Sequence, residues 1–341
     1  MLTVCVGALE AWQQACEDLA ISHSETDRLL KTAQTQTIPL AIPLAIPLAI
    51  PLADFVAMLE LTATRHAGGP LGWIVGERYD FTWLGEIGQA ILSSSTLGAG
   101  LQRFCDYFGL VQDATECALR QTNDTATISY RILAPQIWPR SQDALFTLSI
   151  IGQLLRRARG FDWRSVQIAL EGSDADLITA LRQRTGVPCT GGADTNMIRF
   201  PASALGLPLL AAPDARAPDY KALNRHLAQK RRAMDVELRV ETEIYRLLGA
   251  EHPDHGPDQE RIAANLGMST RTLRRRLAQT DRCFKGILHD CRMKQAAHEF
   301  RWHRRVSIAH TALRLGYSEH SALTRAFRSW SGVSPHAFLD R

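Results

Sequence analysis

Residues 307–341, SIAHTALRLGYSEHSALTRAFRSWSGVSPHAFLDR, decide the fold of the end of the chain. A first helical pattern closes at residues 312–315, Gly316 and Tyr317 break it, and a second helical pattern follows. An apolar helix, a glycine turn and a second helix are typical of a helix-turn-helix, whose second helix enters the DNA major groove. Three apolar residues of the second helix fall on one side and are expected to face inward: Leu323, Phe327 and Trp330.

An earlier segment of the chain repeats this unit. The alanine lets two helices approach closely, the glycine supplies the backbone conformation of a tight turn, and the apolar residues hold the second helix. Measured from the glycine, the second unit is one residue longer than the first. The matching positions are Ala263, Leu266, Gly267, Leu273, Arg275 and Leu277 in the first unit, with Ala312, Leu315, Gly316, Leu323, Arg325 and Phe327 in the second.

Polar and basic residues fall on the outer faces of both recognition helices. At about 100° per residue, Leu273 and Leu277 lie together on the inner face, which turns the arginines outward. Arginine reads guanine bidentately or binds phosphate, although such arginines can also simply keep a surface helix soluble. Two aligned basic units favour DNA binding. The residues expected at the DNA are Ser269, Thr270, Arg271, Arg274, Arg275, His320, Ser321, Thr324 and Arg325.

The helix expected over residues 283–303 joins the two units and carries apolar residues from Phe284 to Phe300. It would act as a rigid spacer. Recognition helices one DNA turn apart, roughly 34 Å, would enter successive major-groove segments on one face of the duplex. A single chain would then read a bipartite site without a partner.

Charge is spread unevenly along the chain. From Gly267 to the end there are 15 Lys/Arg and 5 Asp/Glu, a net charge of +10. Because the whole chain carries +4, the preceding 266 residues carry −6. A basic end on an acidic body is typical of a nucleic-acid-binding end, although a solvated charged face gives the same pattern.

The cysteines and the N-terminus indicate the cellular compartment of the protein. Seven cysteines, an odd number without a C-x-x-C pair, indicate a reduced cytosolic protein with buried thiols and no zinc module. The first twelve residues, MLTVCVGALEAW, have no basic region before their apolar residues, so no signal peptide is expected. No clean apolar run suits a membrane helix. We expect no metal and no cofactor.

The N-terminal part mixes helices and strands without regular βαβ alternation, which predicts an α+β domain over residues 1–212. A segment rich in proline and small residues then predicts a linker over 213–235, which includes a basic helical stretch. An all-α domain is expected over 236–341. The expected helices are 53–64, 96–110, 141–159 and 174–185; the expected strands are 116–121, 125–133, 165–170 and 196–200; residues 72–76 fit either.

Residues 38–53 are four tandem copies of Ile-Pro-Leu-Ala. Proline at every fourth position prevents a membrane helix, so extended or polyproline-like structure is expected. One copy before the helix at 53–64 makes a natural entry segment. The three extra copies are interpreted as a tandem duplication that the fold loops out, with a Pro-rich ligand for a partner as the alternative.

The C-terminal motifs resemble a known family. Ala312-Leu-Arg-Leu-Gly-Tyr-Ser318, Arg325-Ala-Phe327 and Gly332-Val-Ser-Pro335 are similar to the AraC/XylS family of bacterial transcription regulators. Residues 262–277 and the linking helix resemble the same family. The resemblance places the two outer faces described above where the family reads DNA. Thr311 departs from it, because an apolar residue is usual there, and slightly looser packing is expected.

The N-terminal part resembles the effector domain of the ornithine-utilisation-regulator subgroup rather than the cupin sugar domain of the arabinose regulator. The segments that carry this resemblance are Ile50-Pro-Leu-Ala53, GQAILSSSTLGAGL at 88–101, and 200–209. It implies a sensing and dimerisation domain, an effector-responsive activator and a bacterial cytoplasmic location, nucleoid-associated when bound to DNA. The expected partners are double-stranded promoter DNA, RNA polymerase, a small-molecule effector of unknown identity and a second copy, with no membrane. Arg78, Tyr79 and Trp83 are effector candidates that nothing in the sequence singles out.

Other classes of protein find less support. The chain has no Ser-His-Asp arrangement, H-E-x-x-H, G-x-S-x-G or phosphate loop, so no enzyme is expected. His252 and His255 have H-x-x-H spacing but lack further ligands nearby. A methyl-accepting repair protein would need a cysteine cluster, which Cys5 and Cys16 alone do not supply. The remaining alternative is a DNA-binding protein whose N-terminal domain is an enzyme or a partner-interaction module, the latter built on the Ile-Pro-Leu-Ala copies.

Overall fold

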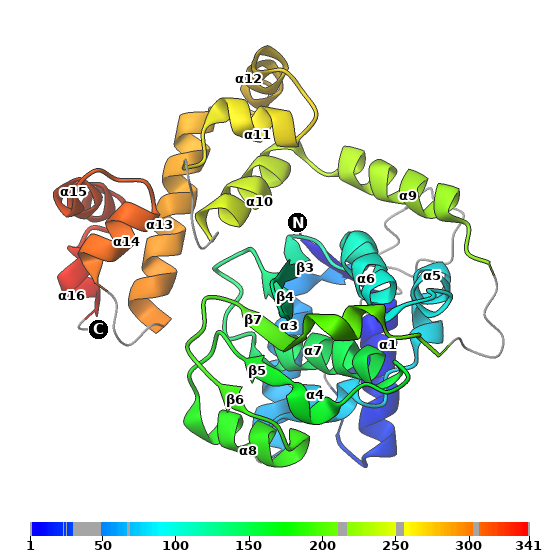
Figure 1. Ribbon diagram of the computed structural model, residues 1–341. Helices are drawn as coiled ribbons and strands as arrows, with labels where there is room; N and C mark the ends of the chain where they lie inside the picture. Colours follow the sequence, from blue (N-terminus) through cyan, green and yellow to red (C-terminus); the bar gives the residue numbers. More distant parts are fainter. Residues whose placement is uncertain are drawn as a thin grey trace. The chain divides into compact units, whose positions relative to one another are not determined.

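The computed structural model describes residues 2–22, 24, 26–29, 49–66, 69–210, 217–249, 256–302 and 307–339. The chain forms two compact units, and each is described by itself (Figure 1). Unit 1 comprises Met1–Ile132 and Ile137–Lys230; unit 2 comprises Leu133–Gln136 and Arg231–Arg341.

Unit 1 contains a five-stranded sheet in the order β3-β4-β7-β5-β6. Its strands are β3 (Thr115–Thr122), β4 (Thr125–Ile132), β5 (Gln167–Ala169), β6 (Cys189–Thr190) and β7 (Asn196–Pro201). All neighbours pair antiparallel except β5 and β6. The predicted hairpin is confirmed, with Thr122 opposite Thr125 and Asn123 at φ 46°. The sequence did not predict β6, because two residues are too few to show an alternating pattern.

The helices of unit 1 surround one buried helix, α7 (Ser141–Arg156). It packs against three other helices and against β4 and β7. The predicted helices are confirmed, although α7 ends at Arg156 instead of 159. Side chains cap two of them, since Thr96 accepts from the Ala99 N–H and Asp174 from the Leu177 N–H. The others are α1 (Val6–Asp18), α3 (Leu52–Arg65), α4 (Leu71–Gly76), α5 (Glu86–Leu92), α6 (Leu97–Val111), α8 (Ala175–Thr185) and α9 (Tyr220–Ala233), with short turns η1 (Phe81–Leu84), η2 (Trp163–Ser165) and η3 (Ala202–Gly206).

A close helix crossing decides the ambiguous segment 72–76, which is helix α4. A Cβ at Gly72 would lie 2.1 Å from the Gln142 carbonyl oxygen of α7, so only glycine fits this crossing. The adjacent Trp73 is fully buried. Burial on all sides explains why the sequence shows neither helical nor strand periodicity here.

The last Ile-Pro-Leu-Ala copy forms the entry to α3, as predicted. Strand β2 (Ala49–Pro51) pairs antiparallel with β1 (Thr3–Cys5), a pairing that the sequence did not predict. Ile50 and Leu52 are buried, and α3 begins at Leu52. Residues 38–48, which hold the other copies, lie outside the described residues, as do His252 and His255.

A buried polar network ties the sheet to α7. The Tyr130 hydroxyl donates to Asp143 Oδ2 over 2.6 Å, and Gln112 Nε2 donates to the Tyr130 oxygen over 2.7 Å. Asp143 is 1% exposed. Burial raises the pKa of its carboxyl to about 6, and the Tyr130 hydrogen bond and the Arg140 charge offset only part of that rise.

Asp143→Asn is expected to remove one pH-dependent contribution to stability. The native carboxyl holds its proton up to a higher pH than the unfolded one, so between about pH 4 and pH 6 the native state binds more protons and the wild-type free energy of unfolding falls as pH rises. The change is on the order of 3 kcal/mol. Urea unfolding at pH 4 and pH 7 should show a larger loss in the wild type and in the exposed Asp124→Asn control than in Asp143→Asn, which keeps the contribution of Glu60, whose pKa burial raises to about 7. Equal pH slopes in all three proteins would contradict the assignment.

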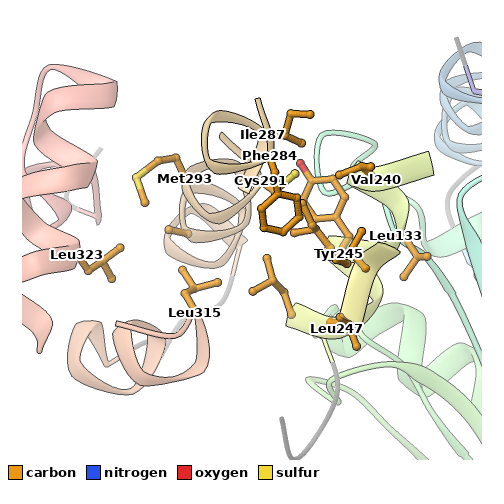
Figure 2. Close-up of a cluster of buried hydrophobic side chains, with 14 of the residues drawn as sticks. Leu133, Val240, Tyr245, Leu247, Phe284, Ile287, Cys291, Met293, Leu315 and Leu323 are labelled. Atoms are coloured by element: carbon orange, nitrogen blue, oxygen red, sulfur yellow. The ribbon is translucent and has the colours of Figure 1, made fainter. Parts of the chain in front are cut away.

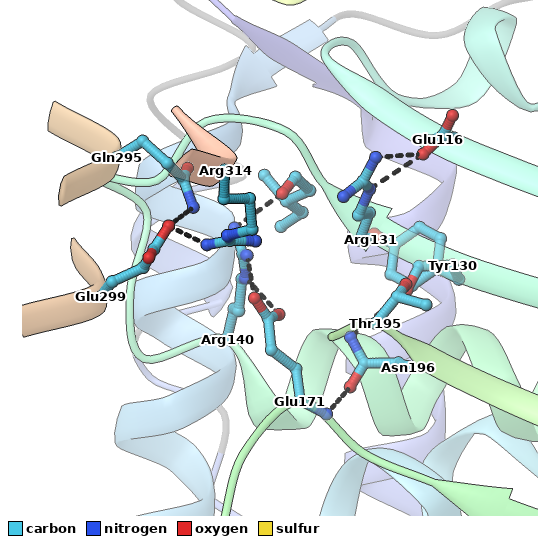
Figure 3. A network of polar contacts seen from close by, with 11 residues as sticks. Glu116, Tyr130, Arg131, Arg140, Glu171, Thr195, Asn196, Gln295, Glu299 and Arg314 are labelled. Carbon is cyan, nitrogen blue, oxygen red and sulfur yellow. Dashed lines mark hydrogen bonds and ion pairs between the residues drawn. The ribbon is translucent and has the colours of Figure 1, made fainter. Parts of the chain in front are cut away.

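Two further ion pairs of unit 1 lie near this network (Figure 3). Arg140 binds the Glu171 carboxylate through two nitrogens, at 2.6 and 3.0 Å, and both side chains are buried. Arg131 and Glu116 pair at 2.5 Å across β3 and β4. A buried arginine held bidentately keeps its charge satisfied away from water, so the first pair fixes the start of α7 against the end of β5.

Unit 2 is helical throughout its described secondary structure, which confirms the predicted all-α fold. Its helices are α10 (Val236–Leu248), α11 (Gln259–Asn265), α12 (Thr270–Ala278), α13 (Phe284–Trp302), α14 (Ile308–Arg314), α15 (His320–Ser331) and α16 (Pro335–Leu339). In the parts of the chain that the structure describes, no helix is long and apolar enough to cross a membrane.

The cysteines correct one expectation. All seven are free, but only Cys16, Cys189 and Cys291 are buried, while Cys283 is exposed. The expectation of buried thiols is therefore wrong for part of the set. Residue type does not show which face of an element a small side chain occupies, so the sequence did not separate the two groups.

Candidate nucleic-acid interface

Both helix-turn-helix units form around their glycines. Gly267 ends α11 at φ +69° and Gly316 ends α14 at φ +81°, a conformation that side chains with a Cβ rarely adopt. Helix α12 begins three residues after Gly267 and α15 four residues after Gly316. The extra residue of the second helix-turn-helix therefore lies in the turn before α15. The positions within the two recognition helices correspond one to one.

Gly316→Ala is expected to cost more stability than Gly267→Ala. Each forces a Cβ into the left-handed region, at roughly 1 kcal/mol or more. At Gly316 the new Cβ would also lie 2.8 Å from Arg292 Nη2, whereas nothing lies within 4 Å of one at Gly267. Denaturant unfolding of the two variants compares them directly. Equal losses would show that the Arg292 side chain yields without cost.

The linking helix α13 is buried on two faces, which confirms its predicted role of joining the two helix-turn-helix motifs. Near its start, Phe284, Ile287 and Cys291 meet Val240 and Tyr245 of α10 (Figure 2). Farther along, Met293 lies toward Leu315 and Leu323. Figure 1 shows α11 and α12 at one end of α13, and α14, α15 and α16 at the other. Because α13 packs against both helix-turn-helix motifs, its sequence has no single apolar stripe.

The inner faces of the recognition helices agree with the prediction except at Trp330. Leu273, Leu323 and Phe327 are fully buried and Leu277 nearly so. Trp330 is 40% exposed, so the expectation that it faces inward is wrong. Phe300 and Phe338 already lie 5.3 Å from the Phe327 ring, which leaves Trp330 only a tilted contact at 5.9 Å on the outside.

The outer faces carry the residues that the sequence selects. Ser269, Arg271, Arg274, Arg275, His320 and Arg325 are exposed, and Thr270, Ser321 and Thr324 are half-buried. Two more arginines are exposed on the same helices, Arg276 and Arg328. Helical periodicity turns Arg328 outward with Arg325, as expected, although it was not among the residues expected at the DNA. Arg276 was omitted, and the run of three arginines at 274–276 was the available signal.

Several of these side chains are held by contacts within the chain. Arg274 Nε donates to Gln259 Oε1 over 3.1 Å, which fixes its position over α11. The Ser321 hydroxyl donates to Glu319 over 2.7 Å, and the Thr324 hydroxyl donates to the His320 carbonyl over 2.9 Å. Ser269 accepts from the Thr272 N–H as the cap of α12. Ser321 and Thr324 therefore need to exchange an internal hydrogen bond before they can donate to a DNA phosphate.

Arg271, Arg275 and Arg325 differ in this respect. Among the residues that the structure describes, none of the three makes a hydrogen bond or an ion pair. An exposed guanidinium without an internal carboxylate keeps its charge and its five donors for an external acceptor. The two recognition helices thus each present cationic groups outward.

Thr311 is accommodated by a buried carboxylate. Thr311 is 1% exposed, and its hydroxyl donates to Glu299 Oε2 of α13 over 3.0 Å. Glu299 also pairs with Arg314 and accepts from Gln295 (Figure 3). The hydroxyl is thus satisfied within the second unit, so the looser packing expected from the sequence is replaced by a polar contact between α13 and α14.

An all-helical unit that holds two helix-turn-helix motifs on one shared helix, with arginines on both outer faces, defines a bipartite DNA-binding protein. A family model described as the arabinose-binding domain of AraC transcription regulator, N-terminal, matches residues 27–209. A helix-turn-helix domain model matches residues 262–341. The chain belongs to the AraC family of transcription regulators, and it is a DNA-binding transcription regulator with that family's N-terminal effector domain.

Known proteins are similar to this chain along most of its length. The chain is 26% identical over 293 residues to the ornithine utilization regulator of Pseudomonas aeruginosa, covering 84% of each chain. It is 27% identical over 308 residues to an uncharacterized HTH-type transcriptional regulator of Mycobacterium tuberculosis, again covering 84% of each. The crystal structure of transcriptional regulator CdpR from Pseudomonas aeruginosa is 22% identical, with a TM-score of 0.41, and covers 94% of this chain and 99% of that one. The resemblance drawn from the sequence is confirmed.

Proposed function

We propose that this protein is an effector-responsive activator that reads two successive major-groove segments with α12 and α15. The main support for this proposal is that both helix-turn-helix motifs are built on the same helix, α13. A helix of 19 residues is about 28 Å long, which is close to the roughly 34 Å repeat of the duplex. Because α13 is buried on both faces, the two recognition helices cannot move independently without exposing apolar surface.

In this proposal the contacts divide by chemistry. Arg271, Arg275 and Arg325 reach base edges or phosphates, and Arg274 is held in place for a phosphate by Gln259. The weaker polar groups, Ser269, Thr270, His320, Ser321 and Thr324, contribute to positioning. The functional boundaries we assign are 1–212 for sensing and dimerisation, 213–235 for the linker and 236–341 for DNA binding. RNA polymerase and a second copy are the proposed protein partners, the bacterial cytoplasm is the proposed location, and no catalytic role is proposed.

Binding to promoter DNA is expected to weaken steeply as salt rises. Each phosphate neutralised by an arginine releases counterions, so the logarithm of the binding constant falls linearly with the logarithm of the salt concentration. Fluorescence anisotropy with a duplex from the upstream region of the regulated gene measures the slope. An arginine that contacts phosphate, when replaced by alanine, should reduce the slope by about 1. A salt-independent binding constant would refute the electrostatic part of the proposal.

A further inference from the structure

Unit 1 contains an apolar cavity between helices that are far apart in the sequence. The gap between these helices measures about 480 Å³ when the open solvent at its mouth is included, and the cavity proper is about 30 Å³. The wall is made by α1, α3, η1, α5, α6 and α7, together with the segment after α4. Most of the lining is aromatic or aliphatic: Phe55, Tyr79, Ile87, Phe104, Phe108 and Phe146.

Two polar side chains interrupt this apolar wall. Gln112, at the end of α6, and Thr147, in α7, both line the cavity and are each 4% exposed. Gln112 donates to the Tyr130 hydroxyl, and Thr147 is hydrogen-bonded to the same hydroxyl, which in turn donates to Asp143. The buried network therefore holds these two polar side chains in place in a wall whose exposed surface is almost entirely apolar.

Among the lining residues that the structure describes, none carries a charged side chain. Burying an ionised ligand in such a wall would cost far more than one or two hydrogen bonds return, whereas a neutral molecule with one polar group loses little. Of the three candidates that the sequence raised, Tyr79 lines the cavity, Arg78 is exposed, and Trp83 is 39% exposed with its ring edge-on to Tyr79 at 5.4 Å.

We propose that this cavity is the effector site and that it takes a neutral, largely apolar small molecule whose single hydrogen-bonding group meets Gln112 and Thr147. The inference rests on the proposed function, in which unit 1 senses an effector, and adds the site and the chemical class. A site of this kind, apolar with a few convergent polar groups, is the common form of small-molecule pockets.

The same end of α6 holds α9, the basic helix at the end of unit 1. Asp113 follows Gln112 directly, and its Oδ1 lies 3.0 Å from Lys230 Nζ. Lys230 also donates to the Leu110 carbonyl over 3.2 Å, and the Tyr107 hydroxyl donates to Asn224 over 3.3 Å. A ligand that moves Gln112 therefore acts on the anchor of α9. The ligand-bound and ligand-free forms of unit 1 then differ in their contacts to α9.

The test is fluorescence titration of the full chain with 1-naphthol, an aromatic that is neutral at pH 7 and carries one hydroxyl. We expect saturable binding tighter than about 1 mM. The anionic 1-naphthoate should bind at least about a hundredfold more weakly, because its charge must be desolvated. Absence of saturable naphthol binding, or equal affinity for the anion, would overturn the proposal.

Two variants locate the binding. Thr147→Val removes the hydroxyl at nearly constant volume and should weaken naphthol by about threefold to tenfold. The matched control is Thr62→Val, a buried helical threonine of α3 that lies outside the cavity and donates to the Met58 carbonyl. Ala8→Leu fills the cavity and should abolish binding, with circular dichroism confirming the fold. If Ala8→Leu does not fold, the comparison of Thr147→Val with Thr62→Val alone decides whether naphthol binds in the cavity.

The outcomes separate this inference from the function on which it rests. Naphthol binding that is unchanged in both Thr147→Val and Ala8→Leu would place the ligand elsewhere and overturn the site, while salt-dependent DNA binding by the same preparation would leave the DNA-binding proposal standing. Loss of DNA binding in the wild type, with naphthol still bound, would refute the proposed function and leave the cavity as a ligand site.

Discussion

Arg325→Ala is expected to weaken promoter binding by roughly tenfold to a hundredfold, with the melting temperature unchanged. Arg325 is exposed on α15 and makes no internal polar contact among the described residues, so its loss removes an external interaction and disturbs no packing. A bidentate arginine contact to a base contributes about 1–3 kcal/mol. Gel shift or anisotropy with the promoter duplex measures the change.

Arg275→Ala makes the same test in the first unit, at the position that the repeat aligns with Arg325. The two losses should add in the double variant, because residues on separate recognition helices without shared partners behave independently. Arg199→Ala, an exposed arginine on β7 of unit 1, is the matched control for the lost charge. If the control lost as much affinity as Arg325→Ala, the assignment of α15 as a recognition helix would be refuted.

Phe327→Ala is expected to lower the free energy of unfolding of unit 2 by about 3–5 kcal/mol, because a fully buried aromatic ring leaves a cavity when truncated. Phe327 holds Phe300 of α13 and Phe338 of α16 together, so the second helix-turn-helix loses its core. Urea unfolding of the full chain followed by far-ultraviolet circular dichroism measures the loss.

Trp330→Ala provides the comparison on the same helix. Its ring is 40% exposed and contacts Phe327 from outside, so we expect a loss of about 1 kcal/mol or less. The sequence pattern alone predicts similar losses for both residues, since both fall on the inner side of the helix. Similar measured losses would favour the sequence pattern over the structure.

Local patterns in the sequence are enough to predict the DNA-binding architecture. Gly267 and Gly316 mark the turns because a positive φ favours a residue without a Cβ, and this preference is local. Leu273, Leu277, Leu323 and Phe327 mark the inner faces because helical periodicity is also local. The basic charge of the last 75 residues follows from composition alone. Most helices and the β3–β4 hairpin were predictable for the same reason.

Features that depend on contacts between distant segments become visible in the folded chain alone. The helical form of residues 72–76 follows from the approach of Gly72 to α7, and the exposure of Trp330 follows from two rings already packed on Phe327. The cavity is lined from six helical elements of unit 1, and its polar patch joins Gln112 and Thr147 through Tyr130 of a strand. Periodicity reports which side of an element is apolar, but it does not report what that side meets, so the candidate effector site had no signal in the sequence.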